Sequence, residues 1–505
     1  MEQIAIESPV PEKLDADYEV IRRLRGYLLA LAILLAAGLI SYSTTVGFVW
    51  DEGFHLLAAK LISQGRTPYI DFCFPQPPLN AYFNAALFSL FGTSWRVTHV
   101  FASLFLAASA YLSAEFVLLR FNITGWRWPC VLLCALFTGL NEIVVQFGPI
   151  AQAYAISMFC SLVAFRVAVV SVGSRTWFLT LFAGVASGAA AASTLLAAPV
   201  APVVLGWLVI YNEAGNRSKK VAAFVLGNIV PFLPVLVLFV KAPRQTFFNV
   251  VQYQALFRRV NWGNVNAHDF DVFTAWIDSV PTFVLVFSAA FGLVFVAKKS
   301  GWHRRQKAEY YLAAALATTL TVYVATAHPT FQRYFIGGTP FFGILAAVGF
   351  FFIASRLWNP SRPFWPVCLM SSVLVLAAGK MIFDTRDSTT WRTYDEIAAK
   401  IAKVTPPGAQ FYADEQIFFL LGKTPMPGME FSYSHKLNLS PAEEKLYHIL
   451  SEKEVNAMVQ AGKFATVESC KDDWIDGTEL SKLFPQQVEI DECTIFWGPM
   501  KHKTN

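Results

Sequence analysis

The sequence predicts a mainly α-helical, polytopic membrane protein that ends in a small α/β domain. Hydrophobic residues make up 55% of the 505 residues and charged residues only 15%, whereas soluble domains carry roughly 25% charged residues. The mean hydropathy is +0.45, and long apolar runs recur through the first three quarters of the chain. This composition excludes collagen-like, disordered and disulfide-stapled proteins.

The apolar runs predict about eleven membrane crossings. A helix needs about 20 mostly apolar residues to cross the roughly 30 Å hydrocarbon layer. The stretch Trp177–Tyr211 is too long for one crossing and has basic residues beyond both ends, so we expect it to cross twice, turning near Ser193 and Thr194. The other predicted spans are Tyr27–Val49, Val97–Leu119, Trp128–Phe147, Pro149–Val170, Val221–Val240, Val280–Ala297, Tyr310–Ala327, Tyr334–Ser355 and Phe364–Phe383.

The positions of Lys and Arg predict which connections face the cytoplasm. With the N-terminus inside, the cytoplasmic connections carry more Lys and Arg than the outer ones, as the positive-inside rule requires. We expect a cytoplasmic segment at 1–26, a transmembrane domain at 27–383 with large outer loops at 50–96 and 241–279, and an extracytoplasmic α/β domain at 384–505. The short outer connections favour a bacterial cytoplasmic (inner) membrane, with the site on its periplasmic face.

The C-terminal 120 or so residues have the pattern of a soluble α/β domain. Ser440 followed three residues later by Glu443 is a capping-box arrangement. Cys470 and Cys493 could pair if this domain faces an oxidising compartment. We expect helices at Tyr394–Val404 and Pro441–Gln460 and strands at Gln410–Tyr412, Phe464–Val467 and Val488–Trp497.

Three carboxylates lie in the first outer loop, beginning directly after the first span. Asp51 and Glu52 follow Trp50, and Asp71 lies in a proline-rich stretch further on. Carboxylates beside lipid are costly unless they have a partner or a task. One interpretation is structural: Asp51 caps a helix through Gly53–Ser63, and Glu52 complements the helix dipole. The other is that they form part of a site.

Here the sequence resembles the membrane-embedded GT-C glycosyltransferases that use polyprenyl-phosphate sugars, in the branch of the protein O-mannosyltransferases, aminoarabinose transferases and galacturonosyltransferase-like enzymes. The matching first-loop motifs are Asp51-Glu52, Gly65-Arg66-Thr67-Pro68-Tyr69-Ile70-Asp71, Pro77-Pro78-Leu79 and Phe91-Gly92 followed by Arg96. A later turn, His328-Pro329-Thr330-Phe331-Gln332-Arg333-Tyr334-Phe335, also matches. The family often has a basic residue where this chain has Gln76.

The resemblance implies transfer of a sugar from a polyprenyl-phosphate donor to an extracytoplasmic acceptor hydroxyl, with inversion. Asp51 matches the family's general base, and Glu52 or Asp71 could orient it, contact the sugar or share a divalent cation with it. Arg333 is the first candidate for binding the donor phosphate, since arginine suits bidentate phosphate contacts. Arg258 and Arg259 follow, and His328 and Tyr334 complete the candidate substrate-binding set.

Several points stay open at the level of sequence. No cofactor is certain, and a divalent cation is possible but unassigned. The acceptor can be a lipid, a glycan or a protein, the sugar is not specified, and we expect contact with membrane lipid but no nucleic acid. The alternative function is a transporter or flippase of a lipid-linked or small solute. Transporters usually hold their charges near the bilayer midplane within repeated halves, and this chain has neither feature.

Overall fold

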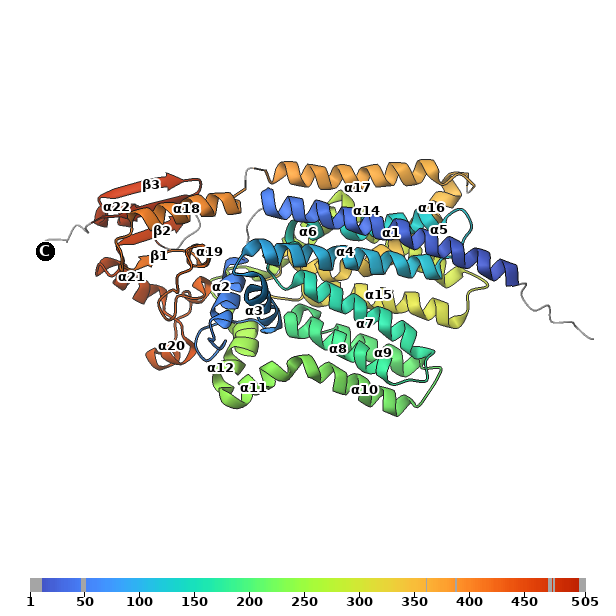
Figure 1. Cartoon of the computed structure of the whole chain (residues 1–505), viewed down its shortest axis with the longest axis horizontal. Coiled ribbons are helices and arrows are strands. Elements are labelled where there is room, and N and C mark those ends of the chain that lie inside the picture. The colour runs from blue at the N-terminus through green and yellow to red at the C-terminus, as the bar shows by residue number, and fades with distance from the viewer. Residues whose placement is uncertain are drawn as a thin grey trace, which may run out of the picture.

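The computed structural model describes residues 11–46, 51–359, 361–386, 388–470, 475 and 477–498, with side chains from residue 18 onward except Thr478. Trp50 and the first ten residues of the predicted cytoplasmic segment lie outside these ranges. Figure 1 shows long helices packed side by side, with a smaller α/β part at one end and the start of α1 at the other. The predicted architecture, a mainly α-helical bundle with a small C-terminal sheet, is confirmed.

Seven helical runs in the described chain are long and apolar enough to cross a membrane. The predicted total of eleven crossings stays a prediction, because several other helices of the bundle are shorter or less apolar. The seven runs lie in α1 (Pro11–Thr45), α4 (Trp95–Arg120), α7 (Tyr154–Val172), α10 (Arg217–Ile229) continued by η2 (Val230–Phe232) and α11 (Leu233–Lys241), α14 (Val280–Lys298), η4 (Gln332–Gly338) with α16 (Thr339–Leu357), and α17 (Phe364–Asp384). The other bundle helices are α5 (Arg127–Gly139), α6 (Glu142–Phe147), α8 (Phe178–Ser193), η1 (Leu195–Ala197), α9 (Val200–Tyr211) and α15 (Arg304–Ala325).

Two expected spans differ from the structure at their ends. The single helix expected at Trp128–Phe147 is divided into α5 and α6, because the side chain of Asn141 accepts a hydrogen bond from Ile143 N at 3.3 Å and caps a new helix. The helix expected from Pro149 begins at Tyr154, and the residues before it form an irregular segment. The chain does turn at Ser193 and Thr194, as expected.

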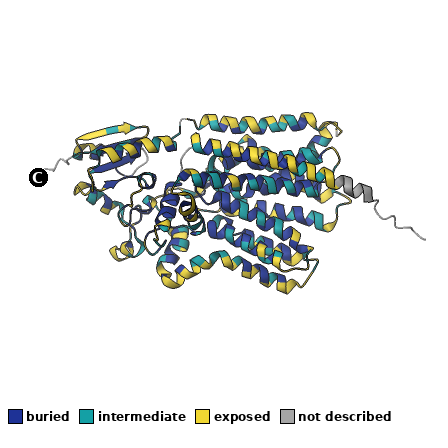
Figure 2. Cartoon of the chain, viewed as in Figure 1, coloured by how far each residue is buried: buried dark blue, intermediate teal, exposed yellow. Residues whose placement is uncertain are grey.

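Small residues bring bundle helices into close contact. A Cβ atom on Gly349 would lie 1.8 Å from Ser288 O, and one on Gly292 would lie 2.1 Å from Leu345 O. The backbones of α14 and α16 therefore touch, as is common where small residues line membrane-helix interfaces. Large apolar side chains such as Leu34, which is 69% exposed, cover the outside of the bundle, where Figure 2 shows exposed positions along the outer helices.

Short helices from the two long predicted outer loops lie at the end of the bundle that carries the α/β part. In Figure 1, α2, α3 and α12 lie between the bundle and that part. These connecting elements are α2 (Gly53–Ser63), α3 (Leu79–Phe91), α12 (Pro243–Phe247), the π-helical η3 (Phe248–Phe257) and α13 (Val265–Asp278).

A four-stranded sheet in the order β1-β2-β4-β3 organises the C-terminal part. β1 (Phe411–Tyr412) pairs in parallel with β2 (Thr466–Cys470), and β4 (Cys493–Trp497) pairs antiparallel with both β2 and β3 (Gln486–Ile490). A disulfide joins Cys470 to Cys493 across the β2–β4 ladder. The helices of this part are α18 (Trp391–Val404), α19 (Glu415–Leu420), η5 (Ser432–Ser434), α20 (Pro441–Tyr447), α21 (Glu452–Gln460) and α22 (Gly477–Leu483).

Two expectations for this part are wrong in detail. The strand expected at Val488–Trp497 is a hairpin of β3 and β4, since Asp491 adopts a left-handed conformation with φ of 55° that suits a tight turn. The helix expected at Pro441–Gln460 is divided into α20 and α21 by His448, which also has φ of 55°. The expected capping box of Ser440 and Glu443 is present.

Candidate active site

Two neighbouring cavities lie between the bundle and the elements from the outer loops. The first, which we call the polar chamber, has a volume of about 70 Å³. The second, which we call the apolar cleft, has a volume of about 440 Å³. Leu195, Leu196, Gln254 and Arg258 line both, so that a polar and an apolar cavity lie side by side. The chamber is also lined by His55, Gln76, Gln152, Ala153, Tyr154, Thr194 and Tyr334, and the cleft by Val250, Val251, Ala255, Arg259, Tyr323, Thr326, Ala327 and His328.

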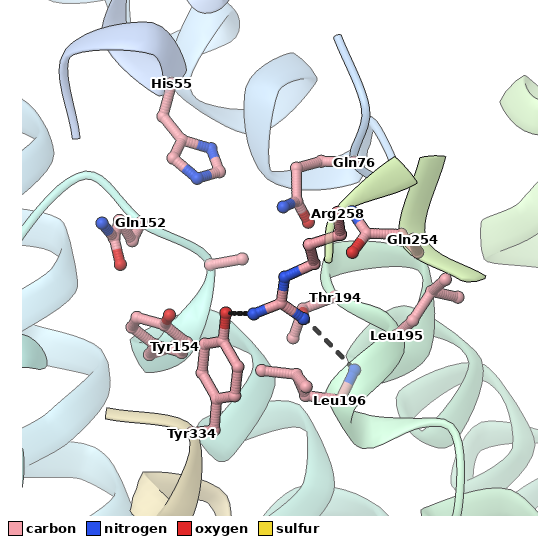
Figure 3. A pocket seen from close by; sticks show the side chains of 11 residues that line it. His55, Gln76, Gln152, Tyr154, Thr194, Leu195, Leu196, Gln254, Arg258 and Tyr334 are labelled. Carbon is pink, nitrogen blue, oxygen red and sulfur yellow. Dashed lines mark hydrogen bonds between the residues drawn. The ribbon is translucent and has the colours of Figure 1, made fainter. Parts of the chain in front are cut away.

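Arg258 lines both cavities, and Figure 3 shows its side chain among those of the polar chamber. Its Nη2 donates to the hydroxyl of Tyr334, and its guanidinium carbon lies 4.9 Å from the centroid of the Tyr334 ring. The backbone around it is held from the C-terminal part, because Lys436 Nζ donates to Arg258 O at 2.8 Å and to Val260 O at 3.1 Å. Arg258 is therefore placed where it can contact a ligand from both cavities.

Positive charge gathers around the apolar cleft. Arg259 lines the cleft beside Arg258. The pKa of Lys436 is lowered by its burial and, to a smaller extent, by the charge of nearby Arg258. His328 lines the cleft too, with its Nδ1 2.5 Å from Asp269 Oδ2. Among the described residues, no Asp or Glu lines either cavity. A cavity with these charges favours an anion.

Asp51 and Arg333 meet although 282 positions separate them in the chain. Arg333 Nη2 donates to Asp51 Oδ2 at 2.5 Å, and the side chains are 8% and 21% exposed respectively. The second carboxylate oxygen, Oδ1, accepts from the hydroxyl of Tyr433 at 2.5 Å. Asp51 thus lies where the first loop, η4 and the C-terminal part come together.

Asp51 lies one contact away from the polar chamber rather than in its wall. The guanidinium carbon of Arg333 is 5.7 Å from the ring centroid of Tyr334, and Tyr334 lines the chamber. Asp51 itself remains partly open to solvent. A small movement of Tyr433 or of the Arg333 side chain would let a hydroxyl group reach the carboxylate.

Glu52 points elsewhere and is fully buried. Its Oε1 accepts from Trp391 Nε1, and its Oε2 lies near His99 Nε2 and accepts from Ala151 N, each at 2.9 Å. The other ring nitrogen of His99 lies 3.1 Å from Ser43 O, which can only accept. With its oxygens engaged, Glu52 holds α4, α18 and the segment before α7 together.

Asp71 belongs to a surface turn. Its side chain accepts from Thr67 N at 2.6 Å, and its own N–H donates to Thr67 O at 2.9 Å. Tyr69 is buried in this turn with φ of 70° and donates its hydroxyl to Gln76 O at 2.6 Å. The Gly65–Asp71 segment thus supports the position of Gln76, which lines the chamber. The three first-loop carboxylates do not converge.

Of the residues predicted from the sequence, the structure brings Arg258, Arg259, His328 and Tyr334 to the cavities and pairs Asp51 with Arg333. The sequence reasoning noted Gln76 as standing where the family often has a basic residue, but it missed other lining residues, among them Gln152 and Gln254. Gln254 is held by a hydrogen bond from its Nε2 to Pro75 O at 2.5 Å. A glutamine in an amphipathic segment carries no pattern that marks it in advance. Asp269 had a weak signal, as a carboxylate beside His268 in the second outer loop.

A divalent cation, which the sequence left open, does not fit the surroundings of Asp51. Hard cations take several oxygen ligands, whereas one oxygen of Asp51 faces a guanidinium and the other a tyrosine hydroxyl. In the described chain, a group of three potential ligands, Glu468, Cys470 and Cys493, occurs in the C-terminal sheet, and its two cysteines form the disulfide. The chemistry of Asp51 is therefore derived without a metal.

Comparison with known proteins identifies the fold. No family model and no curated protein sequence matches the chain. Among solved structures, ArnT from Cupriavidus metallidurans bound to undecaprenyl phosphate matches with a TM-score of 0.64 at 14% identity, covering 94% of this chain and 98% of that one. The oligosaccharyltransferase AglB from Archaeoglobus fulgidus, in complex with an inhibitory peptide and a dolichol-phosphate, matches with a TM-score of 0.50 at 12% identity, over 88% and 69% of the chains. The GT-C fold that the first-loop motifs predict is confirmed.

Proposed function

We propose that the protein is a membrane glycosyltransferase that moves a sugar from a polyprenyl-phosphate carrier to an acceptor hydroxyl on the outer face of the membrane. The observation that carries this proposal is that the apolar cleft and the polar chamber lie side by side, with Arg258 in the wall of both. A lipid-linked sugar has the same order of parts: an apolar chain, an anionic phosphate and a polar ring. The fold is shared with ArnT, whose structure contains undecaprenyl phosphate.

In this proposal each part of the donor has its own contacts. The first isoprene units lie in the apolar cleft against residues such as Val250 and Val251. The phosphate lies between Arg258 and Arg259, in the cleft that His328 also lines. Charge-assisted contacts from arginine suit a phosphate because the guanidinium can donate two parallel hydrogen bonds. The sequence-based assignment of the phosphate to Arg333 is replaced by Arg258, since Arg333 already neutralises Asp51.

The reaction is a single displacement. The acceptor oxygen forms a bond to the anomeric carbon while the bond from that carbon to the phosphate oxygen breaks, and inversion follows. The electron pair of the broken bond stays on the leaving polyprenyl phosphate, whose added charge Arg258 and Arg259 stabilise. The proton of the acceptor hydroxyl passes to Asp51, which exchanges the hydrogen bond from Tyr433 for one from the acceptor.

The proposed orientation places the C-terminal part on the oxidising, non-cytosolic side, in a bacterial inner membrane. The disulfide between Cys470 and Cys493 supports it, because such bonds persist in oxidising compartments. The start of α1 and the C-terminal part lie at opposite ends of the bundle (Figure 1), which agrees with an odd number of crossings. To test this orientation, single cysteines placed at residues 64 and 217 are labelled in intact cells with a membrane-impermeant maleimide. Labelling at residue 217 alone would show that the protein has the opposite orientation.

Transfer can be measured with purified protein in lipid nanodiscs, as release of undecaprenyl phosphate from undecaprenyl-phosphate-linked sugars in the presence of an envelope extract as acceptor source. Asp51→Asn should reduce release by about 10²–10⁴-fold, the usual contribution of a general base. Asp71→Asn is the matched control, because it removes a carboxylate of the same loop that lies in a surface turn. Equal turnover in Asp51→Asn and the unmodified protein would refute the role of Asp51. Flux of the intact donor without bond cleavage would favour a flippase.

A further inference from the structure

Two buried polar atoms in the wall of the polar chamber have no hydrogen-bond partner. They are Nδ1 of His55 and Oε1 of Gln152, in residues that are only 6% and 5% exposed. Both side chains line the chamber, and Figure 3 shows them on the side away from Leu196. Leaving a buried polar group unsatisfied costs about 1–3 kcal/mol. A bound ligand that hydrogen-bonds to both atoms would recover this free energy.

Their neighbours keep both side chains in the wall of the chamber. The His55 ring lies beside Phe54 and Phe74, with ring centroids 4.2 and 5.8 Å away. Gln152 follows Ala151, whose N–H donates to Glu52 and whose carbonyl accepts from Asn80 and Asn84 at 2.9 and 3.1 Å. Packing and hydrogen bonds therefore fix the segments that carry the two unsatisfied atoms.

The hydrogen-bonding wall of the chamber is neutral apart from Arg258. Burial lowers the pKa of His55 to about 3, so its imidazole is uncharged at physiological pH. Gln76, Gln152 and Gln254 supply amide groups, and Tyr154, Thr194 and Tyr334 supply hydroxyls. Gln76 also stands where the resembling family often has a basic residue. Amides and hydroxyls both donate and accept, which matches the hydroxyl groups of a sugar.

The size of the chamber suits one sugar ring. Its 70 Å³ is several times the roughly 10–15 Å³ that one water molecule needs, which suits one sugar ring rather than a longer glycan.

We propose that the polar chamber selects an uncharged monosaccharide as the headgroup of the lipid donor, through hydrogen bonds to His55 and Gln152. This inference rests on the proposed function, because it specifies the sugar that the enzyme transfers. An amino sugar would bring an ammonium group into a chamber lined by no carboxylate of the described chain, and an unpaired buried charge is costly. The carboxylate of a uronic acid would be a second anion beside the phosphate, and it would face the carbonyl oxygen of Gln152, which repels it.

Binding of defined donors tests the inference directly. The probes are undecaprenyl phosphate alone and undecaprenyl phosphate linked to glucose, to 4-amino-4-deoxyarabinose or to galacturonic acid, each measured by native mass spectrometry on protein in nanodiscs. We expect the glucose-linked lipid to bind at least tenfold more tightly than the two charged ones. Tighter binding of either charged sugar would overturn the inference and leave the proposed function standing. Absence of binding by all four lipids would overturn the proposed function itself.

A nearly isosteric substitution gives the second test. Gln152→Glu places a carboxylate in the chamber and should shift the preference at least tenfold towards the amino sugar, with undecaprenyl phosphate alone binding as before. Gln64→Glu is the matched control, because Gln64 is exposed at the end of α2 and lines neither cavity. An unchanged preference in folded Gln152→Glu would show that this position does not contact the sugar and would refute the inference. Gln152→Leu should weaken binding of the glucose-linked lipid only.

Discussion

Substitution of Glu52 separates a positioning role from a catalytic one. Glu52→Gln leaves one carbonyl oxygen, which can still accept from Trp391, and adds an NH₂ group. That group faces the N–H of Ala151, which requires an acceptor, whereas a ring nitrogen such as Nε2 of His99 can accept as well as donate. At least one buried donor is then left without a partner, at a cost of about 1–3 kcal/mol.

The loss of stability in Glu52→Gln can be measured as a fall in the melting temperature, Tm. For 505 residues, with an unfolding entropy of about 2.1 cal/mol/K per residue, a loss of about 1–3 kcal/mol lowers Tm by about 1–3 °C. The same change loosens the Gln152 segment, so the KM for the donor should rise about tenfold. Turnover at saturating donor should stay within a factor of about three, because Glu52 does not touch the reacting groups.

Two matched variants make the experiment decisive. Asp51→Asn should instead nearly abolish turnover, and it should also lower Tm because buried Arg333 loses its charged partner. Glu396→Gln removes an exposed carboxylate and should change neither quantity. Tm by differential scanning fluorimetry and donor kinetics are measured on the same nanodisc samples. A Glu52→Gln protein with unchanged Tm and the same loss of turnover as Asp51→Asn would refute the positioning role.

Three further predictions follow from the contacts described. Burial raises the pKa of the buried Glu430 carboxyl to about 7. Between about pH 4.5 and 7 the folded state therefore keeps a proton that the unfolded state releases, and the free energy of unfolding falls across this range by up to about 3 kcal/mol. Glu430→Gln should remove that fall in denaturation curves from pH 5 to 8, and an unchanged pH dependence would contradict the assignment. Gly349→Val should separate α14 from α16 and lower Tm or abolish folding, whereas Gly379→Val, which meets no atom within 4 Å, should not. Tyr433→Phe removes the hydroxyl that occupies Asp51 Oδ1, so the KM for the acceptor should fall up to about tenfold, the value of one hydrogen bond to a charged group; a rise in acceptor KM would show that Tyr433 assists the acceptor instead.

The general fold could be predicted from the sequence because its signals are local and strong. Apolar runs mark membrane helices whatever their neighbours are, and the turn at Ser193 and Thr194 follows from the length of the run and its basic flanks. Helix ends were less predictable. Asn141 divides one apolar helix by capping a new one, and His448 divides an amphipathic helix. Neither asparagine nor histidine requires a helix to end, so the sequence does not mark these positions.

The site was predictable only in part. The resemblance of the first loop identified Asp51, and that of the later turn identified Arg333, whereas Arg258 and Arg259 were chosen as cations of the second outer loop. The resemblance did not indicate that Arg333 would neutralise Asp51, because that contact depends on how η4 packs against the first loop. Gln152 and Tyr433 left no signal at all, since glutamine and tyrosine are common in segments of any role.

The different environments of Asp51 and Glu52 follow from their adjacency. Consecutive residues entering a helix point about 100° apart, so both side chains cannot face one cavity when the helix is packed on its inner side. α2 is buried along most of its length, which forces one carboxylate inward. Glu52 is that residue, and a buried carboxylate is tolerable only with the donors that His99, Trp391 and Ala151 supply. Asp51 then remains on the open side, where the proposed function requires its base. The two carboxylates thus have different tasks: the inner one holds the segment that carries Gln152, and in the proposed function the outer one receives the proton.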